Sequence, residues 1–200
     1  MASNLVWVDC EMTGLDLAKD EIVEIAVIIT DSDLNILDEG LQLVVKPSDE
    51  ALANMGEFVT KMHQKSGLLP ELASGITLEE ADRLVTEYVQ KFVPEARTAP
   101  LCGNSIGTDR MFINRQMPKL DAHLHYRNVD VSSLKEISKR WFPNVYQAQP
   151  KKQGHHRALT DILESIIELR YYREVILVES PGVKSEQAKA VAERLQADTI

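Results

Sequence analysis

Apolar residues in the first quarter of the chain fall into short runs that are typical of strands. These runs are 5–10 (LVWVDC), 22–30 (IVEIAVIIT) and 36–45 (ILDEGLQLVV). The last two are rich in β-branched residues, which favour extended backbone. The turn-like sequence DSDLN at 31–35 separates them. This arrangement predicts an antiparallel hairpin beside the first strand.

Further along the chain, predicted strands alternate with predicted helices. APLCGNS at 99–105 and RNVDV at 127–131 predict two more strands. Apolar residues at helical spacing predict helices at 49–62, from Thr77 up to Pro94, at 108–116, at 132–142 and at 157–177. We therefore expect an α/β fold with a mixed sheet flanked by helices, in which the first three strands are antiparallel and the later strands are parallel.

Two segments lack this regularity. NVYQAQPKKQG at 144–154 has no apolar period and contains Pro and Gly, which predicts a mobile loop. Beyond SPG at 180–182, residues 183–197 have the composition of a weakly amphipathic, charge-rich helix or tail. We expect a single domain over residues 1–180, long enough for one sizeable core, and a C-terminal helix or tail over 181–200.

The composition is that of an ordinary globular protein. The 200 residues are 44% hydrophobic and 26% charged. No apolar run approaches the roughly 20 residues that cross a bilayer, and no secretory signal precedes the first strand. We expect a cytoplasmic protein without membrane contact, whose two cysteines, Cys10 and Cys102, are packed, reduced thiols.

The net charge restricts the nucleic acids that the chain could hold. At −9, it argues against a broad basic surface for long strands, because such binding neutralises many phosphates. A short nucleic acid in a small pocket is compatible with this charge, particularly if metal ions supply positive charge. The one basic run, KKQGHHR at 151–157, is short.

Four acids stand where packing alone explains them poorly. Asp9 and Glu11 share one strand face with Trp7, because successive side chains of a strand point to opposite faces. Asp109 falls in the first turn of a predicted helix, and Asp161 lies inside another. Each has an ordinary alternative, such as a solvated strand end or a favourable helix dipole. Taken together, they predict a cluster at the ends of strands and adjoining helices.

Such a cluster is tolerable when it binds cations. Neighbouring carboxylates raise one another's pKa, whereas Mg²⁺ and Mn²⁺ prefer oxygen ligands. Two such ions about 3.5–4 Å apart can stabilise both the attacking and the leaving oxygen of a phosphoryl displacement. The clustered acids therefore indicate that a divalent cation is bound among them.

His156 is the candidate proton acceptor for this chemistry. It precedes Asp161 by five residues, which on a continuous helix would place the two side chains about 140° apart. For both to serve one site, His156 must lie before the helix, where a general base could approach the substrate. His155 is an alternative that spacing leaves open.

Three motifs carry a family resemblance. DCEMTGLD, GNSIGTDR and HHRALTD resemble the motifs of the DEDDh class of 3′-to-5′ exonucleases, which have a ribonuclease H-like fold. The longer stretches WVDCEMTGLD, CGNSIGTDRMFI, HYRNVDVSSLKEI and HRALTDILESI resemble the oligoribonuclease family, over about residues 5–178. This resemblance implies an exonuclease domain that degrades very short RNA, dinucleotides especially, to mononucleotides, as the final step of RNA degradation.

The resemblance also implies roles for individual residues. Two Mg²⁺ or Mn²⁺ ions would be bound by Asp9, Glu11, Asp109 and Asp161. His156 would be the general base. The implied substrate contacts are Leu15 wedged between bases, Phe58 stacked on a base with His63 nearby, and Ser105, Tyr126, Arg127 and Ser132 at the 5′ phosphate. Family members commonly have Trp at the position of Phe58, so stacking there would be weaker.

A homodimer is implied as well. In the family, the residues equivalent to Tyr126 and Arg127 reach across the interface into the partner's site, which places Tyr126 among the catalytic residues. Without the resemblance, Tyr126 would be interpreted as a half-buried strand residue and Phe58 as a packing residue. Two other functions remain open: a DNA-directed proofreading exonuclease of the same class, since the motifs address phosphate and metal rather than the sugar, and a catalytically silent nucleic-acid-binding protein.

Overall fold

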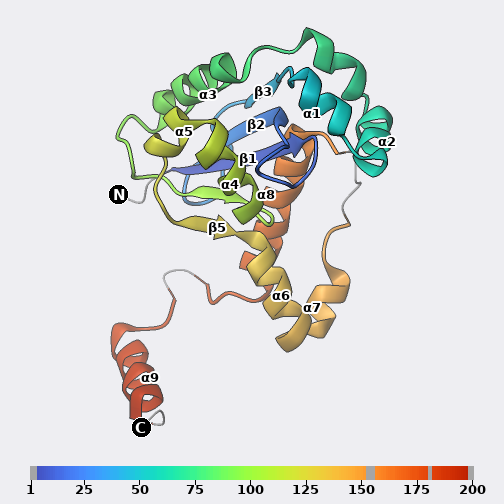
Figure 1. Ribbon diagram of the computed structural model, residues 1–200. Coiled ribbons are helices and arrows are strands. Elements are labelled where there is room, and N and C mark those ends of the chain that lie inside the picture. Colours follow the sequence, from blue (N-terminus) through green and yellow to red (C-terminus); the bar gives the residue numbers. More distant parts are fainter. Residues whose placement is uncertain (1–3, 152–155, 180–181, 198–200) are drawn as a thin grey trace.

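A five-stranded mixed sheet forms the centre of the molecule (Figure 1). The computed structural model describes residues 4–151, 156–179 and 182–197. The strands are β1 (Leu5–Met12), β2 (Ile22–Thr30), β3 (Leu41–Val44), β4 (Leu101–Gly103) and β5 (Asn128–Asp130), in the spatial order β3-β2-β1-β4-β5. The pairs β1–β2 and β2–β3 are antiparallel, and β4 and β5 continue the sheet in parallel. The expected α/β class and the mixed strand directions are confirmed.

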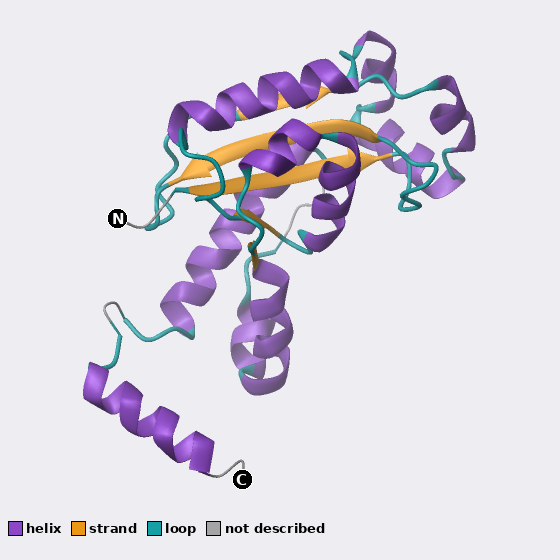
Figure 2. Cartoon of the chain, turned by 60° about the vertical axis from the view of Figure 1, so that its left-hand side comes forward, coloured by secondary structure: helices purple, strands orange, loops and turns teal. Residues whose placement is uncertain are grey.

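Helices cover both faces of this sheet (Figure 2). On one face lie α3 (Leu78–Phe92), α4 (Gly107–Gln116) and α5 (Pro118–His123), and on the other lies α8 (Ala158–Val175). The remaining helical elements are α1 (Asp49–Asn54), α2 (Glu57–Ser66), the 3₁₀-helix η1 (Leu69–Ser74), α6 (Val131–Trp141), α7 (Pro143–Ala148) and α9 (Ser185–Ala197). Helix α9 stands apart from the sheet, and its described side chains are exposed. Among the described residues, none of the helices is both long and apolar enough to cross a membrane.

The alternation of side chains along β1 decides what each face of the sheet meets. Val6 and Val8 point into the core shared with α3 and α4, whereas Trp7 packs against α8 together with Ala26 and Ile28 of β2. All nine residues of β2 are buried, because this strand is covered on both faces. Residues 9 and 11 of β1 therefore face the same side of the sheet as Trp7, toward α8.

Two predicted elements are shorter or divided. The strand expected over 36–45 is reduced to Leu41–Val44, with an isolated bridge from Ile36 to Thr30. Gly40 has a φ of +93° and leaves no room for a Cβ beside the carbonyl of Val27. The backbone before Gly40 therefore does not continue the regular pairing of β3 with β2. The single helix expected over 49–62 is two helices, α1 and α2, because the backbone is extended at Gly56.

Two elements depend on contacts that the sequence pattern did not reveal. Helix α5 begins at Pro118, and the carboxylate of Asp82 on α3 accepts hydrogen bonds from the backbone N–H groups of Lys119 and Leu120. Within 144–154, where a loop was expected, residues up to Ala148 belong to α7, which is held to α8 by a 2.8 Å hydrogen bond from Tyr171 Oη to Val145 O. The loop prediction was wrong for this part, and 152–155 lie outside the described residues.

Candidate active site

The four predicted acids come from three elements that meet at one end of β1. Asp9 and Glu11 lie on β1, Asp109 in the first turn of α4 and Asp161 in the first turn of α8. Asp109 is 6% exposed, and its Oδ1 accepts a 3.0 Å hydrogen bond from the backbone N–H of Cys10. This bond joins the N-terminus of α4 to the strand segment between Asp9 and Glu11. All four acids line one cavity of about 510 Å³.

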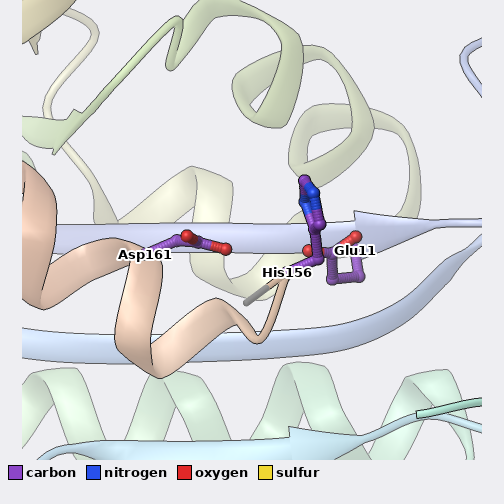
Figure 3. A group of neighbouring side chains, drawn as sticks. All are labelled: Glu11, His156 and Asp161. Atoms are coloured by element: carbon purple, nitrogen blue, oxygen red, sulfur yellow. The ribbon is translucent and has the colours of Figure 1, made fainter. Parts of the chain in front are cut away.

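Glu11, His156 and Asp161 form a group of neighbouring side chains (Figure 3). One ligand atom from each of the three side chains lies within 4.8 Å of the other two. Their elements are different: Glu11 comes from the end of β1, Asp161 from α8 and His156 from the chain just before α8. Two carboxylates and an imidazole at these distances form a donor set that suits a divalent metal ion.

The electrostatics of the cavity favour a cation. The pKa of Glu11 is raised to about 8, chiefly by burial and then by the nearby carboxylates of Asp161, Glu24 and Asp109, while Arg157 acts in the opposite direction. Burial likewise raises the pKa of Asp109 to about 7, against the hydrogen bond that it accepts from Cys10. Negative charge is therefore costly in this cavity, and a bound cation would relieve that cost.

His156 lies outside the helix, as its spacing to Asp161 required. Helix α8 begins at Ala158, and His156 is exposed with a φ of +50°. Its imidazole lines the cavity, so it can approach a molecule bound there. The alternative, His155, lies outside the described residues.

Apolar side chains form the outer wall of the cavity. Leu15, after β1, and Phe58, on α2, are 76% and 79% exposed, and both line the cavity with Met62. Exposed apolar side chains that line a cavity are typical of ligand-binding grooves. The wall is suited to flat apolar groups such as bases.

His63 lies next to the cavity but is not part of its lining. Its side chain is fully buried and does not line the cavity. Nε2 lies 2.9 Å from the carbonyl oxygen of Met12, and Nδ1 lies 3.9 Å from a carboxylate oxygen of Glu11. Burial lowers the pKa of His63, which favours the neutral form. The structure thus places His63 behind Glu11 and not in the open wall.

Serines connect the cavity to the start of α6. Ser105, which lines the cavity, donates its backbone N–H to Ser132 Oγ at 2.9 Å and to the carboxylate of Asp130 at 3.0 Å. The hydroxyl groups of Ser105 and Ser132 are 3.1 Å apart. These contacts bring together two residues that the resemblance assigned to one phosphate-binding segment.

Tyr126 and Arg127 lie away from this chain's own cavity. Neither lines it. Tyr126 is 72% exposed, with the ring of His125 at 4.4 Å on one side and the guanidinium of Arg127 at 5.4 Å. Both side chains are exposed at the surface and lie outside the cavity.

Three charged residues next to the site were missed in the sequence. Glu24 of β2 lies opposite Glu11 and is fully buried. Arg157, which follows His156, contacts the carboxylates of both Glu24 and Glu71. The only signal was an acid inside the otherwise apolar run IVEIAVIIT, which predicts a buried charge in need of a partner.

The fold and the sequence define this chain as a member of an exonuclease family. The model of the exonuclease family RNase_T matches residues 6–169, and the chain belongs to this family. Within it, the chain is 60% identical to an oligoribonuclease of Leifsonia xyli subsp. xyli, over 96% of this chain and 92% of the relative. It is 55% identical to an oligoribonuclease of Streptomyces griseus, over 98% of each chain. The chain is thus a member of the oligoribonuclease family.

Solved structures support the fold. Exonuclease I from Methylocaldum szegediense superposes with a TM-score of 0.63 at 18% identity, over 87% of this chain and 41% of that one. E. coli exonuclease I, solved in complex with an oligonucleotide, gives a TM-score of 0.68 at 15% identity, over 88% of this chain and 42% of that one. This chain therefore spans less than half the length of those exonucleases and shares the arrangement of their nuclease fold.

Proposed function

We propose that this protein is a 3′-to-5′ exoribonuclease that hydrolyses very short oligoribonucleotides, dinucleotides especially, to mononucleotides, the final step of RNA degradation. The observation that carries this proposal is the convergence of Glu11, Asp161 and His156 in a cavity walled by exposed apolar side chains. High identity to oligoribonucleases over nearly the whole chain supports it. The net charge of −9 is compatible, because a dinucleotide needs few phosphate contacts.

The acids fit a site for two Mg²⁺ or Mn²⁺ ions. Their carboxylate oxygens are the ligands that these ions prefer, and burial, which raises the pKa of Glu11 and Asp109, makes a negative charge there costly without a cation. Asp9, Glu11, Asp109 and Asp161 would hold the ions. When bound, two divalent ions stabilise the developing charge on the attacking and the leaving oxygen of the phosphodiester.

His156 is the proposed general base. It is exposed and lines the cavity just before α8. It takes the proton of the attacking water as the phosphodiester at the 3′ end is cleaved. Asp161, five residues later, holds its carboxylate on the same side of the cavity.

The remaining side chains position the substrate. Leu15 and Phe58 contact the bases from the exposed apolar wall, and Ser105 with Ser132 binds the 5′ phosphate. Because Tyr126 and Arg127 are exposed and lie outside their own cavity, we propose that the protein is a homodimer in which they enter the partner's site. The proposal places the enzyme in the cytoplasm, where its two free cysteines remain reduced.

The test is a comparison of substrates. Purified protein with Mn²⁺ is incubated with a labelled RNA dinucleotide, and the products are separated. We expect mononucleotides from the wild type, none from Asp9→Ala or His156→Ala, and wild-type turnover from Glu50→Ala, which removes an exposed acid on α1.

Two other outcomes would replace the proposal. An intact dinucleotide together with degradation of a long DNA strand would favour a DNA-directed exonuclease. Binding of the dinucleotide without any hydrolysis would favour a silent nucleic-acid-binding protein.

A further inference from the structure

Arg157 bridges two carboxylates from different parts of the chain. Its Nε donates to Glu24 Oε1 at 2.9 Å, and one terminal nitrogen lies 2.8 Å from the same oxygen. Its two terminal nitrogens donate to the two carboxylate oxygens of Glu71, each at 3.0 Å. The planar guanidinium is thus engaged on two edges at once, which a lysine could not reproduce.

The Glu24 side of this bridge belongs to the core. Glu24 is fully buried on β2, and its Oε1 also accepts a 2.6 Å hydrogen bond from Gln42. Its Oε2 accepts a 2.9 Å hydrogen bond from the backbone N–H of Ala158, the first residue of α8. A buried carboxylate needs such complete pairing, so this side secures the start of α8.

The Glu71 side is different, because it lies at the surface. The side chain of Glu71 on η1 is 43% exposed, against 25% for Arg157. This partly exposed pair adds less to stability than the buried Glu24 side, although its bidentate geometry makes it stronger than an ordinary surface pair. It does fix the guanidinium, and with it the backbone at residue 157, between β2 and η1.

The neighbouring residue needs such support. His156 has a φ of +50°, in the left-handed region that a side chain with a Cβ rarely adopts. A backbone of this kind persists only where its surroundings hold it. His156 precedes α8, so the helical hydrogen bonds that begin with Asp161 N to Arg157 O do not include it. Arg157 is the next residue, and its bridge is the nearest anchor.

We propose that Arg157, held between Glu24 and Glu71, is a positioning residue that sets the place of the His156 imidazole over Glu11 and Asp161. The proposal rests on the role of His156 as general base. Arg157 does not line the cavity and would act only through the backbone that it shares with His156. Displacement of a catalytic group by about 1 Å can lower the rate by as much as ~10²-fold.

Glu71→Gln tests the proposal, since it removes one carboxylate and leaves the Glu24 side intact. We expect kcat on an RNA dinucleotide to fall about tenfold. KM and the rise in melting temperature on adding Mg²⁺ should stay within about twofold of the wild-type values, because substrate and metal ligands are untouched. Arg157→Lys keeps the positive charge but cannot form paired hydrogen bonds to a carboxylate, and it should lower kcat in the same way.

The chain supplies a matched control. On α3, Arg83 bridges Glu80 and Glu87 by the same chemistry, with distances of 2.6 Å and 2.7 Å. Glu87→Gln breaks one edge of that bridge away from the cavity. We expect its kcat to equal that of the wild type, so a loss confined to Glu71→Gln cannot be a general effect of removing a surface ion pair.

The decisive measurement is the double variant. In a His156→Ala background, Glu71→Gln should cause no further loss of the residual rate, because its effect passes through His156. A further loss of similar size in that background would overturn the proposal, and so would a kcat for Glu71→Gln equal to that of Glu87→Gln. If instead the wild type fails to hydrolyse the dinucleotide, or His156→Ala is fully active, the proposed function has failed, and this inference fails with it.

Discussion

Glu11 of β1 lies directly opposite Glu24 of β2 in the antiparallel ladder, and both carboxylates are buried. Their surroundings differ. Glu24 is paired with Arg157 and Gln42, whereas Glu11 faces the carboxylates of Asp161 and Asp109. The same residue type thus has a structural role on one strand, and on the next it contributes to a site that favours a cation.

This electrostatic difference predicts an unusual pH dependence of stability without metal. The pKa of Glu11 rises from 4.5 to about 8 on folding, and that of Asp109 from 3.8 to about 7. A carboxyl whose pKa is higher in the folded state than in the unfolded state binds its proton more tightly when the protein is folded. Its contribution to stability is fully present below the pKa of the unfolded state and is lost as the pH rises through the pKa of the folded state. The melting temperature in EDTA should therefore fall from about pH 5 to about pH 9.

Calorimetry with and without Mg²⁺ checks this prediction. Added Mg²⁺ should raise the melting temperature more at about pH 8 than at about pH 5, because the ligands must be deprotonated to bind it. Glu11→Gln serves as the control, since it removes one of the two titrating groups and should flatten the curve in EDTA. A melting temperature in EDTA that is independent of pH would contradict the electrostatics described above.

Substitutions in the exposed apolar wall should weaken substrate binding without lowering the stability of the fold. Leu15→Ala and Phe58→Ala should each raise KM for an RNA dinucleotide about tenfold, as expected when a contact to a base worth ~1–3 kcal/mol is lost. Their melting temperatures should stay close to wild type, because these side chains are 76% and 79% exposed. Leu195→Ala on α9 removes another exposed leucine, 53% exposed, away from the cavity and should change neither quantity. An unchanged KM for both wall variants would show that the bases bind elsewhere.

The position of Tyr126 predicts complementation between two inactive chains. Asp9→Ala and Tyr126→Ala should each be nearly inactive as homodimers. If Tyr126 acts in the partner's site, a mixed dimer contains one complete site, formed by Asp9 of one chain and Tyr126 of the other. After subunit exchange at equal amounts, half of the dimers are mixed, which predicts about a quarter of the wild-type activity. Activity no greater than that of the separate variants, or a monomeric mass for the active wild type, would contradict the shared site.

The amino-acid sequence by itself determined the elements whose signals are local. The apolar runs of β1 and β2 and the period of two predicted that Asp9 and Glu11 share the face of Trp7. The start of α3 was also predictable, because Thr77 Oγ1 accepts the N–H of Glu80 within one turn of helix. The spacing of His156 and Asp161 required the histidine to precede α8, and it does.

Only the tertiary structure decided which distant groups compensate one another. The start of α5 depends on Asp82, and the placement of His63 behind Glu11 depends on how α2 packs on the end of β1. The bridge from Glu24 through Arg157 to Glu71 joins residues up to 133 positions apart. The cost of burying a charge is set by neighbours in space, and no periodicity along the chain records them.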